Sequence, residues 1–186
     1  MQILVIDNNT SYLESLKKIL SPHSFSVIKW DDFKYYQLDN YNLIIFSGGH
    51  PNSVEYQHKL YEEEIKTILR SNIPLLGICL GFELIVYAFG GRLKELPEKE
   101  KGEIEIKIIN NNTVLKNITS LKVYESHRWI AESLPKELIP LAKSKDGIEI
   151  VKHITRFIYG FQFHPEIIVD KKGLKIFENL LELASK

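Results

Sequence analysis

The sequence predicts an α/β protein built on a mostly parallel, doubly wound sheet. In the first half of the chain, a short apolar run is followed three times by a turn and then by a segment with helical periodicity. Successive β-then-α units of this kind place their strands side by side, with helices on the faces of the sheet. The second half has short alternating segments, which predict a smaller antiparallel or mixed addition.

The first unit begins at the N-terminus. Residues 2–6 are β-like and lead into polar turn residues. Ser11 and Glu14 have the spacing of a capping box, so a helix is expected over about residues 11–20. A second strand is expected over residues 25–30, after a break that contains proline.

The second and third units follow directly. Residues 43–46 form a compact apolar run, as buried parallel strands do, and stop at a glycine pair. Residues 54–70 carry an apolar stripe at helical spacing and predict one helix. Residues 74–91 read as strand, sharp turn and helix, and the only cysteine of the chain, Cys79, lies at the turn.

The hydrophobic pattern of the sequence changes after the third unit. Residues 103–108 alternate with period two, as in a half-exposed strand. Further short strands are expected at 121–124, 148–151 and 157–163. Residues 172–184 place their apolar side chains on one helical face, so this last helix should pack back on the sheet.

Composition limits the classes of protein to consider. The chain has 186 residues, of which 44% are hydrophobic, and its 24 basic residues balance 24 acidic ones. We expect one globular domain over residues 1–186, without a basic surface for nucleic acid. No apolar run is long enough for a membrane span, no signal peptide is evident, and one cysteine cannot form an internal disulfide, so a cytoplasmic location is expected.

Cys79 is the first candidate for a reactive group. Gly77 and Gly81 flank it, which permits a tight strand-to-helix turn. The N-terminal N–H groups of the following helix would favour a thiolate and lower the pKa from about 8.5. A thiolate attacks carbonyl and carboxamide carbons. The alternative role is that of a small buried apolar residue.

His164 is the candidate base. It closes a strand-like run, and Glu166 follows two residues later. Such a histidine can lie between a nucleophile and an orienting acid, or it can simply stabilise a strand-to-loop turn. The six histidines show no metal-ligand spacing and one cysteine cannot build a zinc site, so no metal is expected.

Ser47, Gly48 and Gly49 follow a buried strand. The carboxyl ends of parallel strands meet at one edge of a sheet, so this turn should lie beside Cys79. Backbone N–H groups of the glycine turn and of Leu80 can then face a developing oxyanion, where one donor contributes about 2.7–4 kcal/mol. The alternative is a plain tight turn.

Taken together, three motifs resemble the class I, or triad, glutamine amidotransferases over essentially the whole chain. The motifs are Ser47-Gly48-Gly49, Gly77-Ile78-Cys79-Leu80-Gly81 and Gly160-Phe161-Gln162-Phe163-His164-Pro165-Glu166. The resemblance implies a flavodoxin-like three-layer fold and hydrolysis of L-glutamine through a γ-glutamyl thioester. It implies Cys79 as nucleophile, His164 as general base and acid, Glu166 as the group that orients His164, and N–H groups of Gly49 and Leu80 in the oxyanion hole.

Within this family, the turn at 47–49 followed by residues 52–54 (Asn-Ser-Val) is most similar to the GMP synthase branch. The resemblance implies L-glutamine as substrate and a separate ATP-dependent synthetase subunit, most similar to the ATP pyrophosphatase that makes GMP from XMP. ATP and Mg²⁺ would bind to that partner, and no cofactor is expected in this chain. The alternatives are the glutaminase subunit of anthranilate or aminodeoxychorismate synthase, a stand-alone γ-glutamyl hydrolase, and a regulatory subunit with a vestigial site.

The sequence departs from the family pattern at the substrate pocket. Glu83 stands where the family has a glutamine that contacts the substrate, and His50 stands where a proline commonly follows Ser-Gly-Gly. Arg128 and Trp129 are expected to line the glutamine pocket or the partner face, the alternative being a surface loop with one anchoring indole. The expected substrate-binding residues are Gly48, Glu83, His127, Arg128 and Trp129.

Overall fold

The computed structural model describes residues 1–38, 40–49 and 52–185. His50, the departure after the glycine turn, lies outside the described residues together with Pro51. The strands are β1 (Gln2–Asn8), β2 (Ser24–Lys29), β3 (Leu43–Gly49), β4 (Leu75–Ile78), β5 (Arg92–Ile108), β6 (Ser120–Ser133), β7 (Leu138–Lys143), β8 (Ile148–His153) and β9 (Ile158–Phe161). The helices are α1 (Leu13–Leu20), α2 (Val54–Gln57), α3 (Glu62–Arg70), α4 (Leu80–Ala88) and α5 (Lys171–Ala184), with short 3₁₀ turns at Tyr35–Gln37 and His58–Tyr61.

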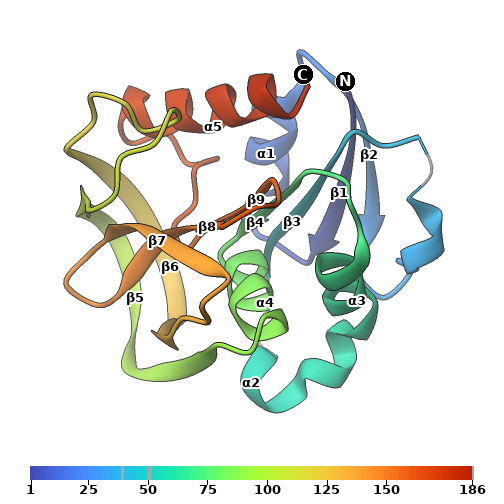
Figure 1. Cartoon of the computed structure of the whole chain (residues 1–186), viewed down its shortest axis with the longest axis horizontal. Coiled ribbons are helices and arrows are strands. Elements are labelled where there is room, and N and C mark those ends of the chain that lie inside the picture. The colour runs from blue at the N-terminus through green and yellow to red at the C-terminus, as the bar shows by residue number, and fades with distance from the viewer. Residues whose placement is uncertain (39, 50–51, 186) are drawn as a thin grey trace.

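The described strands form one sheet in the order β2-β1-β3-β4-β9-β8-β7-β5-β6. Its first five strands are parallel, as the three β-then-α units predict. The next four are antiparallel and continue the same sheet, which curls over on the side of the molecule away from β2 (Figure 1). The predicted α/β class with a parallel centre and an antiparallel addition is confirmed.

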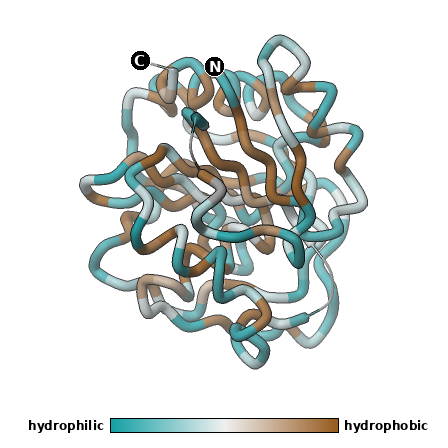
Figure 2. Tube along the Cα trace, turned by 90° about the vertical axis from the view of Figure 1, so that its right-hand side faces the viewer, coloured by the Kyte–Doolittle hydropathy of each residue, from teal (hydrophilic) through white to brown (hydrophobic). Residues whose placement is uncertain are grey.

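Helices cover both faces of the parallel strands (Figure 1). Alternate side chains of β1 divide between the two sides, with Ile3 and Val5 packing toward α1 and α5, and Leu4 and Ile6 packing toward α3 and α4. The central strands are accordingly the most hydrophobic part of the trace, and the surface loops are mostly hydrophilic (Figure 2). Successive side chains of a strand point to opposite faces of the sheet. Both faces are covered by helices here, so both sets of side chains are apolar and buried.

Two expectations about helices are wrong in detail. The single helix expected over residues 54–70 is broken at His58–Tyr61, so that Tyr61 turns inward and donates a hydrogen bond to the backbone oxygen of Asn52. Leu60 and Leu69, expected on the apolar stripe, are about half exposed. The helix expected from Ser11 starts at Leu13 without a side-chain cap.

The antiparallel half is larger than the alternation predicts. β5 and β6 extend well beyond the expected segments 103–108 and 121–124, because their outer parts carry charged residues on both faces and lack the period-two signal. β7 has no counterpart among the expected strands. β7 contains Pro140, a residue that argues against a strand in the sequence. Its pairing with β8 also shifts register between Pro140 and Ala142. Among the described helices, none is both long enough and apolar enough to cross a membrane.

Candidate active site

Cys79 occupies a strained turn between β4 and α4. Its backbone has φ 50° and ψ −100°, and it is the residue immediately before the first turn of α4. The other described non-glycine residues with positive φ are all asparagines, which tolerate this region: Asn9, Asn40 and Asn117. Strain of this kind is retained where the surrounding structure enforces it, and here it aims the thiol out of the end of the sheet.

The flanking glycines make this turn possible. A Cβ atom on Gly77 would lie 2.4 Å from the backbone oxygen of Gly81, and a Cβ on Gly81 would lie 2.4 Å from the backbone oxygen of Phe46. The start of α4 therefore packs directly on β3 and β4. The Cys79 N–H donates to the backbone oxygen of Phe161 at 2.7 Å, which ties the turn to β9 as well.

The pKa of Cys79 is raised, contrary to the expectation of a lowered pKa. The side chain is buried, and burial raises its pKa well above the usual value, with the carboxyls of Glu83, Glu125 and Glu166 acting in the same direction. The N–H of Leu80 at the helix N-terminus opposes this shift, as expected, but it is the smaller effect. A thiol in this environment would need a neighbouring base to take its proton in order to act as a nucleophile.

His164 and Glu166 form the buried pair that the His-Pro-Glu motif predicts. Nδ1 of His164 lies 2.8 Å from Oε1 of Glu166, and both side chains are almost completely buried. The His164 backbone N–H donates to the backbone oxygen of Tyr124 on β6 at 2.9 Å. The edge of Tyr12 packs on the imidazole at 4.6 Å between ring centroids. These contacts occupy Nδ1 and fix the ring, which leaves Nε2 for proton transfer.

Gly48 lies where the His164–Glu166 pair approaches Cys79. A Cβ on Gly48 would lie 2.8 Å from Cε1 of His164 and 3.4 Å from Cβ of Cys79. The imidazole of His164 and the side chain of Cys79 therefore both pack against the backbone of Gly48, which has no side chain to separate them. Gly48 is expected from the sequence to bind substrate, but among the described residues it lies under the imidazole and not in the wall of the cavity described below.

The turn at the end of β3 is braced by Ser47 and Asn8. The Ser47 hydroxyl accepts from the Asn8 N–H at 2.9 Å and donates to the backbone oxygen of Gly48 at 2.7 Å, while Asn8 Nδ2 donates to the Ser47 backbone oxygen at 3.2 Å. Gly49 packs against Asn8 and the Leu80 side chain so closely that a Cβ there would clash with both. Gly49 and the Leu80 side chain are therefore in close contact, and both line the same cavity as Cys79.

A cavity of about 300 Å³ opens on Cys79. Its volume is at the lower end of the range of roughly 300–1,000 Å³ that small-molecule sites have. The cavity lies between the ends of the parallel strands and the antiparallel half. The described residues that line it are Gly49, Asn52, Ser53, Cys79, Leu80, Glu83, Glu95, Lys99, Ser126, His127, Arg128 and Trp129.

Glu83 lies on the first turn of α4 and is almost completely buried in the cavity wall. Burial raises its pKa to about 8, and the neighbouring amide of Gln162 limits the shift. At neutral pH this carboxyl is therefore mostly protonated. A neutral carboxylic acid donates one hydrogen bond and accepts others, as a glutamine side chain does.

Arg128 and Trp129 line the mouth of the cavity. Nε of Arg128 pairs with Oε1 of Glu95 at 2.9 Å, and both side chains are about half exposed. The indole of Trp129 packs edge-on against Tyr56 at 5.5 Å, and Tyr56 itself is 75% exposed. His127 also faces the cavity, but its imidazole is buried and pairs with Glu125.

Sequence reasoning misses several residues of this site. In the sequence, Asn52 and Ser53 only indicate similarity to the GMP synthase branch of the family. In the structure, both residues line the cavity. Glu95 and Lys99 belong to a charged stretch of β5 that offers no signal of its own. Tyr12 falls in an ordinary predicted helix start, whereas its ring supports His164.

Comparison with known proteins identifies the family. Residues 4–183 match the family model "Glutamine amidotransferase class-I". The chain therefore belongs to the class I glutamine amidotransferases. It is similar to a GMP synthase (glutamine-hydrolyzing) subunit of Methanosphaera stadtmanae, with 36% identity over 184 residues that cover 96% of each chain. The protein of the same description from Thermococcus kodakarensis is 38% identical over 152 residues, which cover 77% of this chain and 76% of that one.

Solved structures give the same result for the fold. A putative GMP synthase subunit from Thermoplasma acidophilum superimposes with a TM-score of 0.90 and 25% identity, covering 100% of this chain and 94% of that one. A glutamine amidotransferase from Thermotoga maritima, at 20% identity, has a TM-score of 0.75 over 100% of this chain and 85% of its own. The likeness to the second structure concerns the fold alone.

Proposed function

We propose that this chain is the glutaminase subunit of a two-subunit GMP synthase, and that it hydrolyses L-glutamine and passes ammonia to a separate synthetase. The observation that carries the proposal is the 36% identity, over 96% of both chains, to a subunit of a glutamine-hydrolyzing GMP synthase. The buried His164–Glu166 pair beside Cys79 supports the chemistry. The intact site argues against a vestigial regulatory subunit.

In the first half-reaction, Sγ of Cys79 attacks the side-chain amide carbon of glutamine as its proton passes to Nε2 of His164. Glu166 accepts the Nδ1–H of His164 and stabilises the imidazolium that forms. The N–H groups of Gly49 and Leu80 stabilise the oxyanion of the tetrahedral intermediate. His164 then protonates the departing nitrogen, the C–N bond breaks, and ammonia leaves a γ-glutamyl thioester on Cys79.

In the second half-reaction, water replaces ammonia. His164 removes a proton from the water as its oxygen attacks the thioester carbon. The C–S bond then breaks, the sulfur takes the proton back from His164, and glutamate leaves. Because the resting cysteine is a protonated thiol in this environment, both steps depend on proton transfer at His164.

Glu83 is a neutral substitute for the glutamine that the family uses at this position. With a pKa of about 8, it is mostly protonated at neutral pH and does not repel the α-carboxylate of the substrate. Lys99 and Arg128 are the two basic side chains among the described residues that line the cavity, and they attract that carboxylate. Glu95, paired with Arg128, lies at the same mouth and suits the α-ammonium.

The acceptor chemistry belongs to the partner. The partner is an ATP-dependent synthetase that activates XMP and holds ATP and Mg²⁺, while the glutaminase site uses only side chains and backbone of this chain. The cytoplasm is the proposed location of the complex. The exposed rim formed by Tyr56, Trp129 and Arg128 borders the cavity mouth, where ammonia must leave toward the partner.

The test is reconstitution with the XMP-activating synthetase from the same organism. Glutamine-dependent GMP formation and glutamine hydrolysis are expected with the parent chain. Cys79→Ala should lower both by at least about 10³-fold, because the covalent route is lost, while GMP formation from added ammonia continues. The ammonia reaction is the control for an intact complex.

Two outcomes would contradict the proposal. Parent-level glutamine hydrolysis by Cys79→Ala would exclude the nucleophile. Turnover of γ-glutamyl amides without any partner, in preference to glutamine, would instead identify a stand-alone γ-glutamyl hydrolase.

A further inference from the structure

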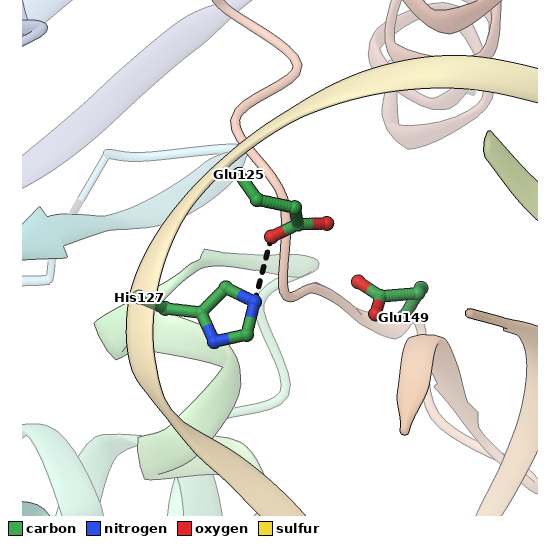
Figure 3. Close-up of side chains that lie close together, drawn as sticks. All are labelled: Glu125, His127 and Glu149. Atoms are coloured by element: carbon green, nitrogen blue, oxygen red, sulfur yellow. Dashed lines mark ion pairs between the residues drawn. The ribbon is translucent and has the colours of Figure 1, made fainter. Parts of the chain in front are cut away.

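A second group of titratable side chains adjoins the cavity, and one of them, His127, forms part of its wall. Glu125 and His127 project from β6, and Glu149 projects from β8 (Figure 3). β7 and β5 separate these two strands in the sheet order, so the group forms where the antiparallel half curls over. The ligand atoms of the three side chains all lie within 4.8 Å of one another.

The group is buried and poorly satisfied. The exposed fractions are 0% for Glu125, 4% for His127 and 1% for Glu149. Nε2 of His127 lies 2.8 Å from Oε2 of Glu125. The carboxyls of Glu125 and Glu149 are within hydrogen-bonding reach of each other, and Glu149 is also within reach of Ser144. Oε1 of Glu125 and Oε2 of Glu149 still lack a partner of good geometry in the described chain. Two carboxylates that face each other are acceptors only, so they cannot satisfy one another while both are ionised.

The surroundings add negative charge. Burial raises the pKa of Glu125 to about 7, the hydrogen bond with Glu149 limits this rise, and the nearby carboxyls of Glu100 and Asp146 add to it. Lys145 contacts both of these outer acids at 3.6 and 3.7 Å, but its side chain is 72% exposed and it contacts neither inner carboxyl. A cation in contact with the inner pair would remove the cost of burying it, which amounts to several kcal/mol per ion.

We propose that Glu125, His127 and Glu149 bind a divalent transition-metal ion of the zinc class. The three supply one imidazole nitrogen and two carboxylate oxygens, a donor set that suits such ions, and a fourth position remains open for water. Metal–ligand bonds of about 2.0–2.2 Å allow at most about 4.4 Å between two ligand atoms of one ion. Because the ligand atoms here lie within 4.8 Å of one another, small side-chain movements would be enough to complete the coordination.

The position of this site gives the metal a structural role. It would join β6 to β8 across the curl of the sheet. The residue before Glu125, Tyr124, accepts the backbone hydrogen bond of His164, and the residues after His127 line the cavity. A metal there would hold one wall of the active site against the strand that leads to the triad. Spacing in the sequence cannot reveal the site, because Glu149 is contributed by a distant strand.

Zinc binding should be measured by titration calorimetry on the full chain, after treatment with a chelator. The Cys79→Ser background removes the only thiol, so that Cys79 and His164 cannot provide a competing zinc site. One zinc ion per chain is expected, with a rise in the thermal unfolding midpoint. Co²⁺ should give visible d–d bands without a sulfur-to-metal band.

Glu149→Gln and Glu125→Gln should each weaken zinc binding by at least about 30-fold, because a neutral amide is a poor ligand. Both changes preserve shape and remove buried negative charge, so the variants should fold, which circular dichroism checks. Glu64→Gln is the matched control, since Glu64 is equally buried but lies outside the cluster. It should bind zinc like the parent.

The absence of one-to-one binding at zinc concentrations up to about 100 µM would overturn the proposal. Equal binding by the parent and both cluster variants would also overturn it. Thermal stabilisation of the parent by acidification alone, with no effect of zinc, would instead show that the two carboxyls share a proton.

Discussion

The parallel and antiparallel halves of the sheet provide opposite walls of one cavity, and they are built differently. In the parallel half, Gly77 and Gly81 lie where backbone packs on backbone, and Gly48 lies against the side chains of His164 and Cys79, so a single added methyl group at any of the three glycines would clash. In the antiparallel half, the wall consists of side chains such as Arg128 and Trp129, whose neighbours are themselves exposed. The proposed catalytic groups are thus held by close backbone packing, whereas the proposed substrate and partner contacts would be made by adjustable side chains.

The halves also differ in how they hold buried acids. In the parallel half, Glu64 and Glu83 are buried separately, and the pKa of each is raised to about 8, mainly by burial. In the antiparallel half, Glu125 and Glu149 are buried against each other and beside a histidine. An isolated buried acid is satisfied by one proton, whereas a facing pair with an imidazole is a potential cation site.

Gly48→Ala is expected to have the largest effect, because it tests the close packing of the parallel half directly. The new methyl group would lie 2.8 Å from Cε1 of His164 and displace the imidazole from Cys79. We expect kcat for glutamine hydrolysis to fall by about 10²-fold, with a small change in KM, because misplacement of about 1 Å has an effect of this size. Steady-state kinetics of the reconstituted complex provides the measurement.

Gly147→Ala is the matched control in the antiparallel half. Its nearest neighbour would lie 3.5 Å from the added methyl group, an ordinary contact. Activity within about twofold of the parent is expected. Similar losses in both variants would mean that the two halves do not differ in rigidity.

Glu64→Gln tests the isolated buried acid. The folded-state pKa of about 8 lies above the ordinary value of 4.5, so the folded chain binds this proton more tightly than the unfolded chain. The stabilisation is complete below about pH 4.5 and is lost as the pH rises through about 8. Near pH 8 we expect the variant to be more stable than the parent by roughly 1–3 kcal/mol in free energy of unfolding, because the hydrogen bond with Asn8 only partly offsets the cost of burying the ionised carboxylate.

Urea unfolding at several pH values measures this effect. Glu62→Gln, an exposed change on the same helix, serves as the control and should shift stability by less than about 0.5 kcal/mol at each pH. A parent whose stability stays constant between about pH 5 and 8 would contradict the raised pKa of Glu64.

Glu83→Gln should have the smallest effect at neutral pH. The parent carboxyl is mostly protonated there, so kcat/KM should change by less than about threefold at pH 7. Above about pH 8, Glu83 ionises, repels the α-carboxylate of glutamine and raises the pKa of Cys79 further. The activity of the parent should therefore fall on the alkaline side while the variant retains more. Parallel pH profiles would show that Glu83 does not titrate in this range.

The parallel half could be predicted in most respects from the sequence. Apolar runs such as Leu43–Phe46 are buried on both faces, and the glycines around Cys79 indicate a turn that the structure contains. The predicted direction of the Cys79 pKa shift is wrong, because three carboxyls and the burial of the thiol depend on tertiary packing. The pairing of Glu125 with Glu149 depends on how the sheet curls, and no local pattern encodes it.

The central claim, that Cys79 is the nucleophile and His164 its base, is tested most directly with a glutamine-analogue diazoketone. The complex with its synthetase partner, XMP and ATP would be treated and the peptides analysed by mass spectrometry. We expect one covalent adduct, on Cys79, that forms in the parent and at least about 10²-fold more slowly in His164→Ala. An adduct on another residue, or equal rates in both proteins, would contradict it.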